Sequence, residues 1–532
     1  MKLFSGSGNR VNNSRNARGS ENGAASRQSR SSSYSGAVWE DEEPRVVKAD
    51  GSAASPAYRP TPDAGYASAA AYAQDPAYDD PYEDDEETAA NRQVAYYTPE
   101  DSRKRQKKRK RKRRLITTSI ILAALAGLYC LCVFSNIPFI AKWRNLYIET
   151  ALMTRTHQWL ATAFIPDFVI DKTRAEIDRN EAAQEGLVSN WDNAQDVSHT
   201  TLPSITKPSD DDAGSEDDPV DEVPFWEDPW SDFCLTYTEI DMDSFAAYAE
   251  EHGDEMYDAD GNLFIDQAGL DQEGTSIKTI YGDQVLALDT VHGITLARLE
   301  GSSDTGPYQG VIAFVKDPSR VGVAVAKRLG VVGQKISGIA EDNDAVLAIN
   351  ASGFEDDEGV GNGGIVYGLL VAGGVKHEGS DGGNYKAVYF DYDNRLHVGT
   401  WKSTNDVRDG VEFKPALVVN GEQATFGSAG WGIHPRTAIG QAEDGSIIMI
   451  VIDGRQPGYS IGITVGELAE MCLKYGAVQA LNLDGGSSSI MYYNGRKITQ
   501  PSGGDRENGR YLPDAFVVYA NRKATDGLER PE

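Results

Sequence analysis

The sequence predicts an α+β protein. It has a β-rich domain of mixed sheet with a crossover helix, preceded by a disordered tail and one transmembrane helix. Three observations predict this class. An uncharged apolar run occupies residues 115–137, far from the N-terminus. From about residue 231, many short apolar runs are broken by glycine pairs, as in DAVLAINASG, which is typical of β-rich domains. Within them, one helical segment stands between two strand-like segments, as in a crossover unit.

The N-terminal tail, residues 1–102, is rich in Ser, Gly, Asn, Ala, Tyr and Asp and poor in aliphatic residues. Such a segment cannot bury enough apolar surface to offset the conformational entropy lost on ordering. We therefore expect it to be disordered. The chain has 532 residues, more than one compact domain usually needs, so folded and unfolded parts are expected side by side.

A basic block at residues 103–114, RKRQKKRKRKRR, lies directly before the apolar run 115–137. About 20 apolar residues are enough to cross a bilayer. The positive-inside rule then predicts a single-pass cell-membrane protein with a cytoplasmic N-terminus and an extracellular C-terminal domain. A nucleic-acid or nuclear-localisation patch is the alternative interpretation of the block. We favour the membrane, because the block adjoins the span and the net charge of −30 makes the rest of the chain acidic.

Two segments separate the span from the folded domain. Residues 138–184 have helical spacing, with Leu146, Met153 and Leu160 on one face until Pro166 interrupts it, and predict a helical stalk. Residues 185–230 are rich in Asp, Glu, Pro and Ser and predict an acidic linker that holds the folded domain, 231–521, away from the membrane. Four cysteines indicate no disulfide framework, although one Cys234–Cys472 bridge is a less favoured alternative.

A β-hairpin is predicted around Asp444-Gly445, which stands between two β-rich runs in TAIGQAEDGSIIMIVIDG. Arg436 lies eight residues before Asp444, and Asp453 lies nine residues after it. Antiparallel pairing therefore places Arg436 and Asp453 at the same open end of the hairpin.

A crossover unit follows the hairpin. Thr464 and Glu467 form a capping-box pattern before LAEMCLKY and Gly476, which predicts a helix from about residue 465 to 475. The next run, AVQALNLD, reads as a buried strand ending at Asp484. A strand, a helix and a strand normally return parallel and right-handed. Asp453 and Asp484 then share one edge of the sheet, where active sites of α/β sheets usually lie.

The residue types at this edge suit a phosphorylated or phosphodiester substrate. Two neighbouring carboxylates can differ in pKa and divide the roles of acid and base. Arginines bind phosphate in a bidentate manner, and glycines let backbone N–H groups approach an anion. We predict Asp484 and Asp453 as the catalytic pair, with a substrate-binding set of Arg436, Arg455, Gly485, Gly486, Ser488, Asn350 and Glu467. Asn350 and Glu467 are secondary, and we favour a capping role for Glu467.

The metal requirement is unknown from the sequence. The carboxylates that could bind Ca²⁺ are Asp356, Asp357, Glu358, Asp453 and Asp484, but they do not follow a strict ligand spacing. Ca²⁺ is therefore a cofactor candidate without a defined site.

Several motifs resemble the phosphodiester glycosidase family, in order over roughly residues 280–520. They are AINASGFEDDEGVGNGG at 348–364, PALVVNGE at 415–422, HPRTAIG at 434–440, VIDGRQPGYSIGITVGELAEM at 451–471, ALNLDGGSSSIMYYNG at 480–495 and ENGRYLPDAFVVYA at 507–520. The chain departs from the family pattern at Ser352 and at Glu355-Asp356, and Ser487 stands where a third glycine is usual.

The resemblance implies hydrolysis of a sugar-1-phosphate diester, which releases the sugar and leaves a phosphomonoester on the acceptor. Bacterial members of the family are often described as exopolysaccharide-related, so a carbohydrate or sugar-phosphate of the cell envelope is the expected substrate. Two alternatives stay open. One is a cell-wall glycopolymer phosphotransferase of the same topology, and the other is a non-catalytic glycan-binding envelope protein.

Overall fold

The computed structural model describes residues 98–154, 156–191, 201–207, 230–356, 361–377, 379, 385–400, 403–505 and 508–531. Most of the predicted tail, residues 1–97, lies outside the described residues, and so do 192–200 and 208–229 of the predicted linker. Asp357 and Glu358, two of the candidate Ca²⁺ ligands, lie outside them as well.

Helix α2, Pro99–Phe134, begins at the N-cap Thr98 and runs without a break through the basic block and the apolar run. Its apolar window is only 6% buried, and it is long and apolar enough to cross a membrane by length and composition. The helix ends at Phe134, three residues before the predicted end of the span. A candidate membrane helix is therefore present where the sequence predicts one.

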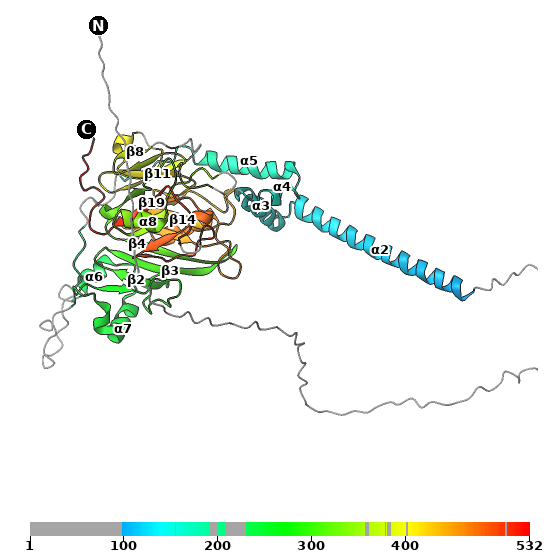
Figure 1. Cartoon of the computed structure of the whole chain (residues 1–532), viewed down its shortest axis with the longest axis horizontal. Helices are drawn as coiled ribbons and strands as arrows, with labels where there is room; N and C mark the ends of the chain where they lie inside the picture. The colour runs from blue at the N-terminus through cyan, green and yellow to red at the C-terminus, as the bar shows by residue number, and fades with distance from the viewer. Residues whose placement is uncertain are drawn as a thin grey trace, which may run out of the picture. The chain divides into compact units, whose positions relative to one another are not determined.

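Three helices follow α2: α3 Pro138–Met153, α4 Trp159–Thr162 and α5 Asp167–Ala183 (Figure 1). The expectation of one continuous face up to Pro166 is wrong, because α3 ends at Met153 and Thr154 is extended. The break lets the chain fold back, so that Ile148 and Ala151 pack against Ile165 and Val169 in a small core. Burial of these apolar side chains outweighs continuation of the helix.

The strands of the described residues form three antiparallel sheets. The nine-stranded sheet has the order β1 Phe264–Asp266, β2 Gln284–Asp289, β3 Ile294–Ser303, β4 Gly306–Val315, β15 Ile447–Ile452, β14 Arg436–Ala442, β16 Ala477–Asn482, β12 Ala416–Val419, β13 Glu422–Gln423. A first five-stranded sheet has the order β18 Arg496–Lys497, β17 Met491–Tyr493, β6 Ala345–Asn350, β19 Asp514–Tyr519, β5 Val321–Val325. The second has the order β10 Leu396–Gly399, β9 Lys386–Phe390, β11 Asp409–Phe413, β7 Leu370–Ala372, β8 Val375–His377.

The main core lies between these sheets and combines apolar side chains from all three. Helix α9, Val465–Lys474, covers the other face of the nine-stranded sheet. Helix α8, Ile336–Asp342, packs on the sheet that contains β6 and β19 (Figure 1). Two further helices, α6 Ser231–Thr236 and α7 Met242–His252, join β1 and β2 in a separate core. The predicted α+β class is confirmed.

The predicted hairpin and crossover are both present. Strand β14 pairs antiparallel with β15, with Arg436 opposite Ile452, and antiparallel with β16 on its other side. Strands β15 and β16 therefore run parallel to each other with β14 between them. Asp453 and Asp484 follow their carboxyl ends, on next-but-one strands whose backbones are roughly 10 Å apart at the usual strand spacing.

Helix α9 has both halves of the predicted capping box, from Thr464 and Glu467, and ends at Lys474, one residue before the predicted end. The four cysteines lie among the described residues and form no disulfide, so the alternative of a Cys234–Cys472 bridge is wrong.

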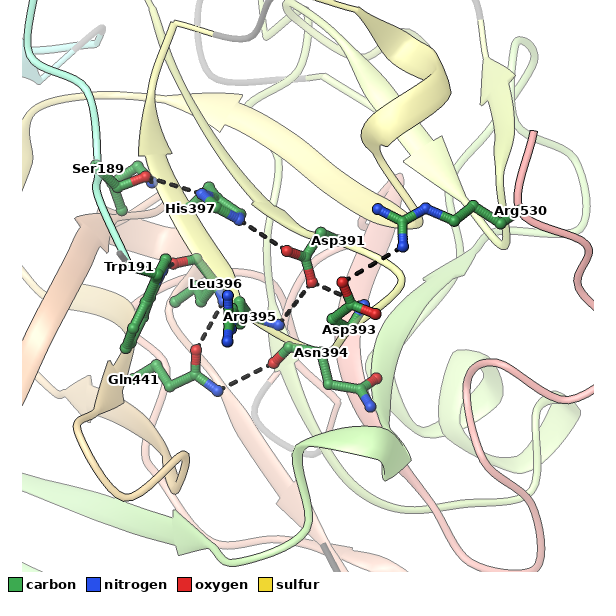
Figure 2. Close-up of polar contacts among 11 residues, drawn as sticks. Ser189, Trp191, Asp391, Asp393, Asn394, Arg395, Leu396, His397, Gln441 and Arg530 are labelled. Carbon is green, nitrogen blue, oxygen red and sulfur yellow. Dashed lines mark hydrogen bonds and ion pairs between the residues drawn. The ribbon is translucent and has the colours of Figure 1, made fainter. Parts of the chain in front are cut away.

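Residues 187–191, here called the strap, fasten the start of the predicted linker to the domain (Figure 2). Val188 forms a β-bridge with Gly399, and the Trp191 indole N–H donates to the Leu396 carbonyl at 2.9 Å. Ser189 Oγ lies 3.1 Å from His397 Nδ1, and His397 Nε2 lies 3.0 Å from an Asp391 oxygen. Ser189 also accepts the Val398 N–H, so this Ser–His–Asp chain joins the strap to β10.

Candidate active site

The loop after β16 carries the predicted Asp484, Gly485 and Gly486, and Asn350 holds it in place. The Asn350 side chain donates to the Asp484 carbonyl at 2.7 Å and accepts from the Thr437 hydroxyl and the Ile490 N–H. Asn350 ends β6, whereas Thr437 lies on β14 of the other sheet. The structure therefore brings Asn350 to Asp484 as predicted, with its amide engaged in joining the two sheets.

Two charged groups flank Asp484. Burial lowers the pKa of Arg455, and the neighbouring Asp484 carboxylate opposes this by raising it. Asp514, fully buried at the start of β19, also interacts electrostatically with Asp484. Burial raises the pKa of Asp514 to about 6, and the charge of Asp484 adds to the rise. The Ser352 N–H, which donates to Asp514 at 2.8 Å, opposes it. Asp484 thus has a guanidinium and a second carboxyl within electrostatic reach.

Arg455 adopts a left-handed backbone conformation with φ of 59°. Such conformations are uncommon for residues other than glycine and cluster at functional sites. Its guanidinium lies against Gly486, where a Cβ would stand 3.0 Å from Nη2. Gly486 itself has φ of 63°, so glycine is required there for backbone and space alike. The predicted Arg455 and Gly486 are therefore in contact.

His434 is buried beside Arg455 and was not predicted as a site residue. Arg455 Nη2 lies 3.0 Å from His434 Nδ1, and burial, with Arg436 and Arg455 nearby, lowers the His434 pKa well below its usual value. A neutral ring that accepts at Nδ1 carries its proton on Nε2. Nε2 is buried without a hydrogen-bond partner in the described structure. The sequence signal that could have identified His434 is its position two residues before Arg436.

Arg436 lies in the wall of the site, and its guanidinium is largely occupied. Nε donates to the Ile463 carbonyl at 3.1 Å, and Nη2 donates to the carbonyls of Trp431 and Gly432 at 3.0 and 2.8 Å. These bonds account for three of its five N–H groups. Burial lowers its pKa to about 9. The geometry gives Arg436 a role in fixing the loop at 431–434.

Glu467 serves as the capping residue that the sequence favours. Its Oε2 accepts the Thr464 N–H at 2.8 Å and the Thr464 hydroxyl at 3.0 Å. The Thr305 hydroxyl donates to the same oxygen at 3.2 Å. Its carboxylate is therefore committed to the start of α9.

Asp453 is buried at the end of β15 with its own set of donors. Both its oxygens accept the Gln500 N–H at 2.9 Å, and Oδ2 also accepts the Tyr459 hydroxyl at 2.9 Å. Burial raises its pKa to about 7, against the lowering effect of these donors and of Lys497. It therefore retains a proton close to neutral pH.

Arg510 is a second arginine at the glycine-rich loop and was not predicted as a site residue. It pairs with Asp356 through both Nη atoms at 2.8 Å and donates to Ser487 Oγ at 3.0 Å. Its guanidinium also lies 4.7 Å from the centre of the Phe354 ring. Asp356 and Ser487, two departures from the family pattern, thus meet at one arginine.

The remaining predicted residues belong to the loop backbone. Gly485 packs against Pro435, whose carbonyl would lie 2.8 Å from a Cβ, and Gly486 N–H donates to the same carbonyl at 2.9 Å. Ser488 is buried, and its N–H donates to the Gly485 carbonyl. Two donors of the predicted anion-binding loop are therefore used within the protein.

The described residues contain no group of three or more His, Cys, Asp or Glu side chains arranged to hold a metal ion. Of the candidate Ca²⁺ ligands, Asp356 pairs with Arg510, and Asp453 accepts from Gln500 and Tyr459. What the arrangement can offer is the Arg455 guanidinium as an anion-binding group, next to carboxyl groups that can exchange protons.

A protein-family model described as phosphodiester glycosidase matches residues 343–519. An uncharacterised SPβ prophage-derived protein of Bacillus subtilis, YomE, is 31% identical over 185 residues, or 32% of this chain and 28% of that protein. The N-acetylglucosamine-1-phosphodiester α-N-acetylglucosaminidases of Bos taurus and Homo sapiens are 37% and 38% identical over 76 residues, or 14% of each chain. The match thus spans less than a third of each curated relative.

Among solved structures, the catalytic domain of the zebrafish N-acetylglucosamine-1-phosphodiester α-N-acetylglucosaminidase, auto-inhibited by its pro-peptide, aligns with a TM-score of 0.37 and 19% identity. The alignment covers 49% of this chain and 90% of that domain. A hypothetical protein from Synechocystis aligns with a TM-score of 0.32 and 17% identity, over 45% of this chain and 65% of that protein.

Proposed function

We infer, from the phosphodiester glycosidase domain that this chain carries at residues 343–519, that the protein is an enzyme that hydrolyses sugar-1-phosphodiester linkages. The bovine and human relatives are named for N-acetylglucosamine-1-phosphodiester, which supports this substrate class. The proposed natural substrate is an extracellular glycan of the cell envelope or an exopolysaccharide. Helix α2 would anchor the protein, with the cytoplasmic N-terminus and extracellular domain that the positive-inside rule favours.

The placement of Arg455 carries the proposal. Its guanidinium rests on the Gly486 backbone, contacts His434 and lies within electrostatic reach of Asp484. A phosphodiester bound there would put its single negative charge on an arginine and its scissile bond beside a carboxylate. Charge-assisted hydrogen bonds of this kind are the strongest that proteins make to phosphate. Arg510, paired with Asp356, donates to Ser487 on the same loop and would hold that loop in place.

The acid and base follow from the surroundings of each carboxyl. Asp453, with a pKa of about 7, would keep a proton to donate to the leaving oxygen. Asp484 would accept a proton from the water that attacks as the bond to the leaving oxygen breaks. One water is consumed, one proton is given and one is taken, so the reaction balances. Asp514 would influence the protonation of Asp484, because their charges repel.

A phosphotransferase is the second candidate. Helix α3 contacts the segment that leads into the site, since Thr150 Oγ1 accepts the Ile433 N–H at 3.1 Å. The helix after the candidate span therefore reaches the site, which favours an acceptor linked to membrane lipid. Analysis of the products in water separates hydrolysis, which gives free sugar, from transfer, which gives a new diester.

The test uses the full-length chain in detergent with a methyl ester of N-acetylglucosamine-1-phosphate. We expect sugar release, and a fall in kcat of about 10²–10⁴-fold in both Asp484→Asn and Asp453→Asn, because each removes one proton-transfer group. Asp444→Asn, in the exposed hairpin turn, should retain full activity. Undiminished turnover by both site variants would exclude the assigned roles, whereas binding without turnover in the natural sequence would favour a glycan-binding protein.

A further inference from the structure

Aromatic side chains are unusually exposed on the helices that follow α2. On α3 they stand four residues apart and share one face, and others follow on α4, on the α4–α5 connection and on α5. The set is Phe139, Trp143, Tyr147, Trp159, Phe164 and Phe168. Phe139 has 71% of its surface exposed, and Phe164 has 60%. Contiguous exposed apolar surface marks an interaction site, and Trp and Tyr are enriched at membrane–water interfaces.

This aromatic surface contacts the last turns of α2 directly. The Phe168 ring stacks on Phe134 with centroids 6.0 Å apart. The Tyr129 hydroxyl donates to the Phe164 carbonyl at 2.8 Å. Arg144 on α3 donates to the carbonyls of Val133 and Ser135, which satisfies backbone groups at the end of α2. Helices α3 to α5 are thus packed beside the end of the candidate membrane helix.

The length of α2 fixes the depth of this contact. The uncharged stretch from Leu115 to Phe134, with Phe134 as the last residue of α2, gives the roughly 30 Å that a bilayer core requires, with no length to spare. Tyr129 lies five residues before that end, or about 7 Å deeper at the helical rise. The Phe164 carbonyl, which accepts the Tyr129 hydroxyl, therefore lies in the outer part of the hydrocarbon core.

An apolar groove of about 480 Å³ opens between α2, α3 and the α4–α5 connection. Its lining includes Cys132, Phe139, Ile140, Trp143 and Ile165. We propose that helices α3 to α5 lie in the membrane interface, with phospholipid chains filling this groove. The aromatic set then seats the extracellular domain on the bilayer that α2 crosses, instead of leaving it on a free tether.

The same helices hold the active-site loop, residues 427–434. The Ile433 N–H donates to Thr150 on α3, and a Cβ on Gly430 would stand 2.1 Å from Ile177 on α5. Glu149 on α3 interacts with Ser428 and Gly432 of this loop. The loop delivers His434 and the carbonyls that hold Arg436. Seating on the bilayer therefore sets the position of the site, and, given the proposed function, selects substrates close to the membrane surface.

The test measures depth, so it does not depend on catalysis. The full-length chain carries Cys130→Ser, Cys132→Ser and Cys234→Ser, while the buried Cys472 stays. A single cysteine at Phe164→Cys, Leu122→Cys or Val331→Cys takes a polarity-sensitive fluorophore, and the protein is placed in nanodiscs of phosphatidylcholine and phosphatidylglycerol. Spin-labelled lipid should quench the probes at 164 and 122 severalfold more than the probe at the exposed Val331.

Three results would overturn the proposal. Quenching at 122 with none at 164 would mean that α2 crosses the membrane while helices α3 to α5 stay outside the interface. Protection at 164 that persists in detergent, without quenching by lipid, would mean a second copy covers the helices. Absence of quenching at 122 would mean that α2 does not cross the bilayer, and the inferred depth of Phe164 would then have no basis. If the labelled variants fold poorly, brominated-lipid quenching of intrinsic fluorescence should fall in Trp143→Phe/Trp159→Phe relative to the natural sequence.

Discussion

Individual residues at the site owe their charge states to the strands that surround them. Asp514 begins a fully buried strand, and its pKa rises because burial and Asp484 both disfavour its ionised form. Burial alone raises the pKa of Asp453 further, to about 7, against the lowering effects of Gln500, Tyr459 and Lys497. Both carboxyls therefore keep a proton in the folded protein at a pH where the unfolded chain has lost it.

Asp514→Asn should flatten the dependence of stability on pH. Between about pH 4 and about pH 6 the unfolded chain binds fewer protons at this position than the folded one, so the free energy of unfolding falls as pH rises. The slope is at most about 1.4 kcal/mol per pH unit. Urea unfolding at several pH values in this window should show a smaller slope in the variant than in the natural sequence.

The matched control is Asp453→Asn, whose effect should extend to about pH 7 because its pKa is higher. If the slopes of the natural sequence and Asp514→Asn coincide, the carboxyl is ionised in the folded state and does not share charge with Asp484.

Part of this site can be identified from the sequence, because local turn and helix patterns bring those residues together. The hairpin and crossover place Asp453, Asp484 and Arg455 at one edge, as predicted, because strand direction follows from turn and helix signals. His434, Arg510 and Asp514 escaped prediction as site residues. Asp514 lies on β19, in a different sheet from β14, β15 and β16. No local sequence motif indicates that β19 pairs with β6. Arg436 was predicted to bind substrate, but a sequence cannot show that its guanidinium already donates to backbone carbonyls.

At the scale of elements, helix α9 joins β15 to β16 and thereby sets the spacing of the two catalytic candidates. Its predicted start is confirmed because a capping box is a local signal that needs no tertiary information. The break after α3 is a tertiary effect, so the periodicity from Leu146 to Leu160 predicted a longer helix. The start of α9 is thus set by a local sequence signal, whereas the end of α3 is set by tertiary packing.

Thr464→Ala should destabilise α9. The variant loses the hydroxyl that accepts the Glu467 N–H, at a typical cost of about 1 kcal/mol. Thermal unfolding should show a lower midpoint. Thr464→Ser, which keeps the hydroxyl, should melt close to the natural sequence. Equal melting of the Ala and Ser variants would show that the cap contributes nothing measurable.

At the scale of the whole described molecule, the segment from α3 to the strap is built into the domain. Glu181 pairs with Lys414 at 2.7 Å, and the buried Gln184 exchanges hydrogen bonds with Ala416 and donates to Thr425. The predicted stalk pattern gave no indication of these contacts, because each joins residues more than two hundred positions apart.

Gln184→Leu should destabilise the domain by about 1–3 kcal/mol, because it leaves the buried Ala416 N–H without its acceptor, although the Ala416 carbonyl still accepts the Thr425 hydroxyl. Urea unfolding of the full-length chain in detergent measures the change. Gln272→Leu, on an exposed turn, is the control and should unfold like the natural sequence. A loss no greater than that of the control would mean that the segment is only loosely attached.

The strap has a consequence for proteolysis. On the other side of residues 192–200, the chain rejoins the domain through Ile205, which is buried and accepts the Leu263 N–H, and through Lys207, which donates to Gly261. A protease that cuts between Trp191 and Thr201 would thus sever one peptide bond between two segments that each remain bound to the same body. Such a nick would leave helix α2 and the folded domain held together as a two-chain protein.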